Sequence, residues 1–242
     1  MNKLIHGIWQ EELPKIESES IDLIIIDPPY IVTKEKWDKE EVVNDRLSFE
    51  LFRVAKQNCS IYIWCGIGEK SQSLIRWFPI FNKDWYFKDL ITWKKQRGIG
   101  MRKGWMYTRE ECMWFVKNNK EFIWNKENQY DVSSTRKRDK YKLLNGQNGK
   151  PPLSIYKRWT NIWDDVTEQG KETMLKKTSH FTPKPITYME RIILSHTKEN
   201  DTVLDCFLGS GTTMQACNNL NRNCIGIEKE LEYYNYCKQF IE

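Results

Sequence analysis

The sequence predicts an α/β protein with a doubly wound sheet of seven strands. The apolar run at 21–26 has the length of a buried strand and ends at two consecutive prolines, which cannot continue a sheet ladder. A second strand at 203–206 leads into a Gly-x-Gly turn and a helix, and a third strand follows at 224–228. Strands that alternate with helices in this way are typical of a sheet covered on both faces.

The other elements follow from the spacing of apolar residues along the chain. The further strands are predicted at 4–5, 61–64, 87–93 and 111–116. The helices are predicted at 10–16, 48–58, 71–78, 186–196, 212–220 and 231–241. We find no internal repeat, and 242 residues are enough for one α/β domain over 1–242 with a full core. The periodic pattern is interrupted between 96 and 159, where charge and glycine increase.

The tetrapeptide Asp27-Pro28-Pro29-Tyr30 directly follows the first long strand, at the end where open α/β sheets bind ligands. Its two prolines force a rigid turn. The turn fixes an acid, a free backbone carbonyl and an aromatic ring in one small space, and these groups suit a planar ring that bears an amino group. Taken alone, the motif could also be a simple strand-ending turn.

The segment 202–228 has the pattern of a nucleoside site. Gly209 and Gly211 let the backbone approach a ligand closely, and Glu228 ends the next strand, where an acid can accept hydrogen bonds from ribose hydroxyls. A nicotinamide enzyme would normally have a third glycine three residues after the second, and this chain has Met214 there.

Together these motifs resemble those of the DNA amino-methyltransferases, which move a methyl group from S-adenosylmethionine to adenine N6 or cytosine N4. The Asp-Pro-Pro-Tyr motif precedes the Phe-x-Gly-x-Gly motif, an order that resembles the circularly permuted β class. The resemblance continues over 91–95, 109–116, 161–163 and 180–185, so it covers nearly the whole chain. It implies a Rossmann-like methyltransferase sheet with a small inserted target-recognition region at 96–159.

The resemblance also implies roles for single residues. Asp27 and the Pro28 carbonyl would accept the N–H groups of the target amine, and Tyr30 would stack on a base flipped out of the duplex. The expected catalytic set is Asp27, Pro28, Pro29 and Tyr30. The expected cofactor-binding set is Asp27, Thr182, Lys184, Asp205, Phe207, Gly209, Gly211, Thr212 and Glu228, with Thr182 and Lys184 on the carboxylate side.

Two positions depart from the family pattern. Members often have an acid near the cofactor's adenine soon after the N-terminal strand, and this chain has Ile8 there. Cys206 stands where a proline is common. The adenine contact is therefore in doubt, whereas the cysteine changes only local packing.

Two basic segments lie within or beside the inserted region. A solvated loop accounts for any single charge, but as a set the segments predict contacts with nucleic-acid phosphates. From 134 to 158 there are eight Lys or Arg residues and one acid. The expected nucleic-acid-binding residues are Lys94, Lys95, Arg97, Arg102, Lys103, Arg136, Lys137 and Arg138.

Composition limits the other possibilities. The net charge is +5, and neither the three histidines nor the seven cysteines have metal-ligand spacing, so we expect no metal and reduced core thiols. We expect a cytosolic protein, because there is no apolar stretch of membrane-spanning length and no signal-like N-terminus.

The predicted function is site-specific methylation of adenine N6 in DNA, with S-adenosylmethionine as cofactor. Adenine is preferred because many cytosine-N4 enzymes of the family have serine in place of Asp27. Cytosine N4 stays open, as do an RNA methyltransferase and a nucleic-acid-binding subunit without activity. A homodimer is also open.

Overall fold

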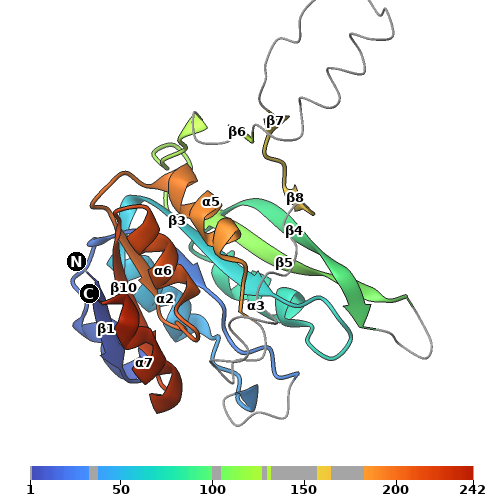
Figure 1. Cartoon of the computed structure of the whole chain (residues 1–242), viewed down its shortest axis with the longest axis horizontal. Helices are drawn as coiled ribbons and strands as arrows, with labels where there is room; N and C mark the ends of the chain where they lie inside the picture. The colour runs from blue at the N-terminus through green and yellow to red at the C-terminus, as the bar shows by residue number, and fades with distance from the viewer. Residues whose placement is uncertain are drawn as a thin grey trace, which may run out of the picture.

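The structure is a computed structural model that describes residues 2–32, 38–99, 105–126, 130–131, 157–164 and 183–241. Its centre is an eight-stranded sheet (Figure 1). In spatial order the strands are β1 (Lys3–His6), β10 (Asn223–Glu228), β9 (Thr202–Asp205), β2 (Ile21–Ile26), β3 (Ala55–Cys65), β5 (Tyr107–Val116), β4 (Tyr86–Ile99) and β8 (Ile162–Trp163). Neighbouring strands are parallel except where β5 pairs with β3 and β4.

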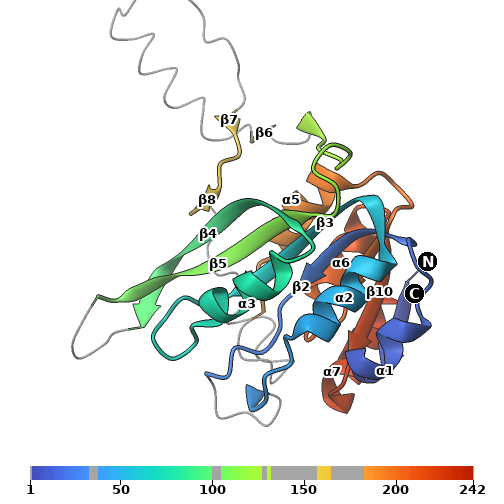
Figure 2. The ribbon, with the colours of Figure 1, turned by 180° about the vertical axis from the view of Figure 1, so that it is seen from behind.

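Helices cover both faces of the sheet. On one face lie α1 (Trp9–Glu12), the 3-10 helix η1 (Leu13–Lys15), α2 (Asp45–Val54) and α3 (Ser73–Phe81) (Figure 2). On the other face lie α5 (Ile186–His196), α6 (Thr212–Asn219) and α7 (Leu231–Cys237), which continues into the 3-10 helix η4 (Lys238–Phe240). The predicted doubly wound α/β class is confirmed.

Strand β2 supplies core residues to both faces because successive side chains alternate across a strand. Ile24 and Ile26 pack into the cluster that contains α2 and α3, whereas Leu23 and Ile25 pack into the cluster that contains α5 and α6. All six residues of β2 are buried. The apolar run therefore has the composition of a central strand in a two-sided sheet.

The sheet has one strand more than the seven predicted. The additional strand, β8, has only two residues and pairs with Thr92 and Trp93 of β4. The N–H of Thr92 also donates to the carbonyl of Asn161 at 2.8 Å. So short a strand has no periodicity for a sequence pattern to show. A separate two-stranded sheet pairs β6 (Tyr130–Asp131) with β7 (Lys157–Arg158).

The predicted helix at 48–58 ends too late. Helix α2 begins after Asn44, whose side chain accepts a hydrogen bond from the N–H of Leu47 at 3.0 Å, and ends at Val54. Residues 55–58 instead start β3, because contacts distant in sequence hold them extended. The Lys56 amine lies 2.7 Å from Asp22, and Gln57 donates to Glu19 at 2.6 Å.

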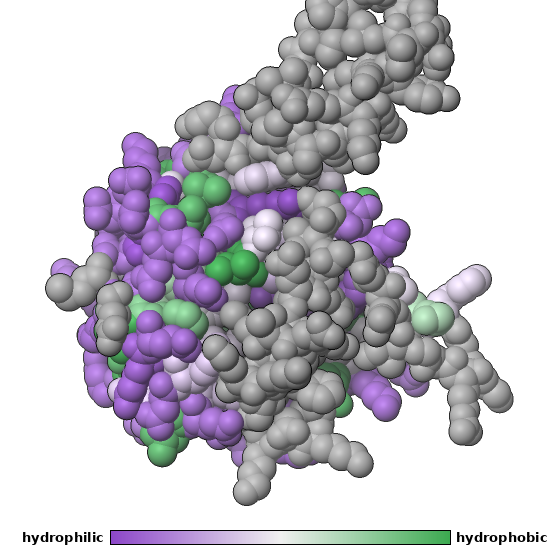
Figure 3. Space-filling model, viewed as in Figure 1, coloured by the Kyte–Doolittle hydropathy of each residue, from purple (hydrophilic) through white to green (hydrophobic). Residues whose placement is uncertain are grey.

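All seven cysteines lie in the described part of the chain, and they are free and buried. Burial raises the pKa of the thiols of Cys65, Cys112 and Cys206. On the face of the molecule seen in Figure 3, the described surface over α6 and α7 is mostly hydrophilic. Among the described residues, no helix has both the length and the apolar character needed to span a membrane.

Candidate active site

The site lies where the strand order reverses. From β2 the chain goes to its neighbour β3, whereas from β9, on the other side of β2, it goes outward to β10. Helices that leave adjacent strands in opposite directions open a crevice at the carboxyl ends of those strands. Asp27 follows β2 and Asp205 ends β9, so the two predicted motifs meet at this crevice.

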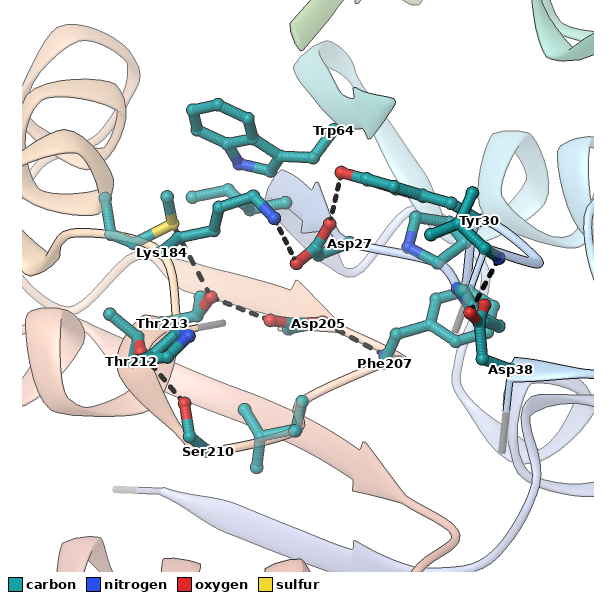
Figure 4. Close-up of a pocket in the computed structure, with 18 residues that line it drawn as sticks. Asp27, Tyr30, Asp38, Trp64, Lys184, Asp205, Phe207, Ser210, Thr212 and Thr213 are labelled. Atoms are coloured by element: carbon teal, nitrogen blue, oxygen red, sulfur yellow. Dashed lines mark hydrogen bonds and ion pairs between the residues drawn. The ribbon is translucent and has the colours of Figure 1, made fainter. Parts of the chain in front are cut away.

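A pocket in the crevice joins the two motifs (Figure 4). Half of its lining comes from residues that the sequence did not single out, among them Trp64, Met189, Ser210 and Thr213. The predicted residues that line it are Asp27, Pro28, Pro29, Tyr30, Lys184, Asp205, Phe207, Gly209 and Thr212.

Both carboxylate oxygens of Asp27 have partners. The Tyr30 hydroxyl donates to Oδ1 at 2.7 Å, and the Lys184 ammonium lies 2.6 Å from Oδ2. Burial raises the pKa of Tyr30, and the negative charge of Asp27 raises it further, so the hydroxyl keeps its proton. The acid of the motif is therefore held in a fixed orientation while its side chain stays 29% exposed to the pocket.

The turn after Tyr30 is held by an acid that the sequence did not indicate. Ile31 has a φ of +62°, a left-handed conformation that is costly for a β-branched residue. Asp38 stabilises it by accepting the N–H groups of Ile31 at 2.5 Å and Val32 at 2.8 Å. Asp38 is buried and lines the pocket, so it keeps Tyr30 in place beside Asp27.

Lys184 lies in the turn before α5 and is 8% exposed. Besides Asp27, its ammonium lies 3.2 Å from Oε2 of Glu110 on β5 and 5.4 Å from the centres of the Tyr30 and Trp64 rings. The structure thus gives this amine two protein carboxylates. Its contact with a cofactor carboxylate stays a prediction, and Thr182 lies outside the described residues.

Asp205 organises the turn of the second motif. It accepts the Phe207 N–H at 3.0 Å and the Thr213 hydroxyl at 2.7 Å. Burial raises its pKa to about 7. Gly209 has a φ of +55°, which glycine adopts without strain, so the chain can turn sharply between β9 and α6.

A second pocket adjoins the first and shares Asp27, Pro29, Phe207 and Gly209 with it. Glu228 lines this second pocket and accepts the N–H groups of Gly209 at 2.6 Å and Glu230 at 2.8 Å, while burial raises its pKa. The remaining lone pairs of its carboxylate are available to a ligand. The departure at Ile8 also lies in this pocket.

The structure gives Gly211 a packing role. Its φ is +79°, and a Cβ added there would lie 2.7 Å from Sγ of Cys237 and 2.8 Å from the Phe240 ring. Gly211 is therefore required for the C-terminal helix to pack on the start of α6. It does not line the first pocket, and its contact with a cofactor stays a prediction.

The predicted basic residues are only partly described. Lys94 is exposed on β4, but the Lys95 ammonium contacts the Glu110 carboxylate beneath it, and its side chain is 19% exposed. The side chain of Arg97 and all of Arg102, Lys103, Arg136, Lys137 and Arg138 lie outside the described residues. Residues 107–116 fall within the numbers of the predicted insertion at 96–159 and form β5 of the main sheet, where a strand was predicted at 111–116. The target-recognition role of the inserted region stays a prediction.

Among the described residues, no group of three or more potential metal ligands is found. Among the charged residues of the site, Glu110 and Asp38 are the two to which sequence reasoning gave no role. One signal existed for Glu110: it and Glu111 begin an apolar strand, so alternation directs one carboxylate to each face of the sheet. No pattern marked Asp38, whose partners lie in the preceding turn.

The chain is similar in sequence and in structure to known proteins. A sequence model of N6/N4 DNA methylases, described as DNA methylase, matches residues 21–239. The type II methyltransferase M1.MboII of Moraxella bovis is 31% identical over 97% of this chain and 94% of its own length. The DNA adenine methyltransferase YhdJ of Escherichia coli (strain K12) is 31% identical over 95% and 79%. The crystal structure of the M1.HpyAVI-SAM complex matches all of both chains with a TM-score of 0.66 at 26% identity.

Proposed function

Because this chain belongs to the N6/N4 DNA methylase family, we propose that it is a site-specific DNA methyltransferase that methylates adenine N6 with S-adenosylmethionine. The observation that carries the proposal is the position of Asp27. It stands where two adjoining pockets meet, with the Tyr30 ring beside it. An amino group that enters here meets a fixed carboxylate next to a site of nucleoside type.

Two features of the pockets support the proposed cofactor, namely that they adjoin and that their lining is rich in carboxylates. One pocket is lined by Asp205 and the turn after it, and the other contains Glu228, so an elongated ligand can span both around Phe207. A lining rich in carboxylates favours a positively charged ligand. S-adenosylmethionine supplies an electrophilic methyl group on a sulfonium sulfur. We assign its methionine part to the pocket of Asp205 and its ribose to Glu228.

The residues of the Asp-Pro-Pro-Tyr turn would activate the target amine. Its lone pair is delocalised into the ring, so the free base is a poor nucleophile. Asp27 and the Pro28 carbonyl accept its two N–H groups, which favours a pyramidal nitrogen and directs the lone pair toward the methyl group. After transfer the nitrogen is cationic, and its extra proton leaves through Asp27 or water.

The target base must leave the duplex to reach this turn, because the pocket cannot receive a stacked base. Unstacking costs a few kcal/mol. Stacking on the Tyr30 ring would return about 1–3 kcal/mol, enough to offset much of that cost. Adenine is the proposed base because Asp27 begins the motif, and the relative YhdJ is a DNA adenine methyltransferase.

The experiment is to incubate the purified chain with labelled S-adenosylmethionine and mixed-sequence DNA, then to identify the methylated nucleosides by mass. N6-methyladenine is the expected product. If N4-methylcytosine is found instead, the target base is cytosine and not adenine. The same assay is run in parallel with RNA in place of DNA, and with DNA in the presence of a metal chelator. We propose that RNA is not methylated and that chelation leaves the activity unchanged.

Asp27→Asn is the control for this experiment, because amide and carboxylate have nearly the same shape. It should abolish transfer while cofactor binding stays measurable by calorimetry. Turnover near that of the unaltered protein would refute the placement of the target amine on Asp27.

A homodimer is a separate proposal. Phe49 on α2 and Ile75 on α3 are 61% and 64% exposed, and their helices pack together on the face opposite α6 and α7. Sedimentation velocity of the unaltered protein and of Phe49→Ser tests it. A monomer at micromolar concentration, with or without DNA, would contradict it.

A further inference from the structure

Four side chains of alternating charge form a line from the edge of the sheet to the catalytic turn. Lys95 on β4 contacts Glu110 on β5 through Oε1. Oε2 of Glu110 lies 3.2 Å from the Lys184 ammonium, which in turn lies 2.6 Å from Oδ2 of Asp27. The side chains of Glu110 and Lys184 are 14% and 7% exposed, so little water reaches the centre of this line.

The charges in this line stabilise one another. Burial favours the neutral form of Glu110, but the ammonium groups of Lys184 and Lys95 more than offset it, and the pKa of Glu110 is lowered. Burial opposes the charge of Lys184, but the carboxylates of Asp27 and Glu110 raise its pKa above the ordinary value. The titratable groups that face Lys184 are Asp27 and Tyr30 after β2, Cys65 on β3, and Glu110 and Cys112 on β5.

The line creates a conflict at Asp27. In this structure Oδ1 accepts the Tyr30 hydroxyl and Oδ2 is paired with the Lys184 ammonium. The proposed reaction requires Asp27 to accept an N–H of the target amine as a further hydrogen bond. The carboxylate is a stronger acceptor for that N–H when the hold of Lys184 on Oδ2 loosens. A buried ammonium left without a carboxylate carries a large desolvation cost. A second carboxylate within reach removes that cost.

We propose that Glu110 is a positioning residue that gives the Lys184 ammonium a second carboxylate, so that Asp27 can release it and accept the target amine. Lys95 holds the other oxygen of Glu110 and keeps Oε2 directed at Lys184. Glu110 itself does not line the pocket and acts only through Lys184. This inference rests on the proposed methyl transfer.

The test is Glu110→Gln in the full chain, assayed for DNA methylation. The amide keeps the size of the side chain but removes its charge, so Lys184 stays on Asp27. We expect kcat to fall at least ten-fold, with KM for S-adenosylmethionine unchanged within about three-fold. Without the second carboxylate the pKa of Lys184 falls. The kcat of the variant should therefore begin to rise at a lower pH than that of the unaltered protein.

Glu111→Gln is the matched control. Glu111 is the next residue on β5 and is more deeply buried than Glu110, but its carboxylate accepts the Thr92 hydroxyl at 2.7 Å and pairs with Arg109. The substitution Glu111→Gln can change the stability of the fold but should leave the pH profile of kcat as it is in the unaltered protein. The second control starts from Lys184→Met, which removes the ammonium through which Glu110 acts. In that background, adding Glu110→Gln should lower kcat by no more than about two-fold.

The outcomes separate the two proposals. An unaltered protein that transfers no methyl group to DNA refutes the proposed function and, with it, this inference. If the unaltered protein is active, two results refute this inference and leave the proposed function standing. One is an unchanged kcat in Glu110→Gln, and the other is an equal loss of kcat from Glu110→Gln with Lys184 present and with Lys184→Met. Should Glu110→Gln not fold, Lys95→Met carries the test. A several-fold loss of kcat supports the inference, whereas an unchanged kcat overturns it.

Discussion

Tyr30 combines two functions in one side chain. Its ring faces the pocket, and its hydroxyl donates to Asp27 at 2.7 Å. A hydrogen bond to a charged group contributes about 1.5–3 kcal/mol, and loss of base stacking costs about 1–3 kcal/mol. Tyr30→Phe should therefore lower kcat about ten-fold, because Asp27 loses its orientation. Tyr30→Ala should lower kcat/KM for DNA by about five-fold or more beyond that.

Steady-state kinetics on one short duplex distinguishes these two contributions. Equal effects of Tyr30→Phe and Tyr30→Ala would show that the ring does not stack. An unchanged kcat in Tyr30→Phe would show that the hydroxyl does not orient Asp27.

Asp205 makes the stability of the fold depend on pH. Its pKa is about 7 in the folded chain because of burial, against an ordinary value of 3.8. Between these values the folded state binds more protons than the unfolded state, so stability falls as the pH rises through that range. Asp205→Asn removes this dependence. The stability of the variant relative to the unaltered protein should therefore be greater at pH 8 than at pH 5.

Urea unfolding at the two pH values measures this difference. Glu228 also has a raised pKa, but it is present in both proteins, so its contribution cancels in the comparison. A difference in unfolding free energy that is the same at pH 5 and pH 8 would contradict the assignment to Asp205.

At the scale of elements, Gly211 controls how the C-terminal helix packs. Gly211→Ala should destabilise the fold by about 2 kcal/mol or more, because it adds a left-handed alanine and a clash with Cys237 and Phe240. Gly68→Ala is the control, since its Cβ would lie 3.6 Å from the Tyr107 ring, an ordinary contact. Equal urea midpoints for the two variants would contradict this packing role.

Strand β4 directs two neighbouring lysines in opposite directions. Lys94 is exposed, whereas Lys95 reaches Glu110. If Lys94 contacts a phosphate, Lys94→Ala should reduce the slope of log affinity against log salt by about 0.9, with kcat at saturating DNA unchanged. Binding titrations from 50 to 200 mM salt measure the slope. An unchanged slope would remove Lys94 from the DNA surface.

Local pattern predicted most elements, and helix 186–196 has the predicted ends. The errors occur where distant contacts decide the structure. Residues 55–58 are extended because Lys56 and Gln57 find partners before β3 in the chain, and β8 exists only because β4 offers an edge. The same division holds in the site. Asp27 directly follows a strand and Asp205 ends one, and both were predicted. Asp38 instead accepts backbone N–H groups of the turn before it, which no sequence pattern marks, and Glu110 acts through Lys184, which only the fold brings near.

At the scale of the whole molecule, the buried thiols are distributed over both faces of the sheet. Cys59, Cys65 and Cys206 belong to the cluster under α2 and α3, and Cys112, Cys217, Cys224 and Cys237 belong to the cluster under α5 and α6. A thiol-specific reagent reacts with the thiolate, and burial excludes the reagent from all seven thiols. Burial also raises the pKa of Cys59, Cys65, Cys112 and Cys206, which lowers the fraction of thiolate at these positions. Alkylation therefore requires the chain to open around each thiol. Peptide mapping of the alkylated cysteines would then give the order in which the two layers of the native protein separate.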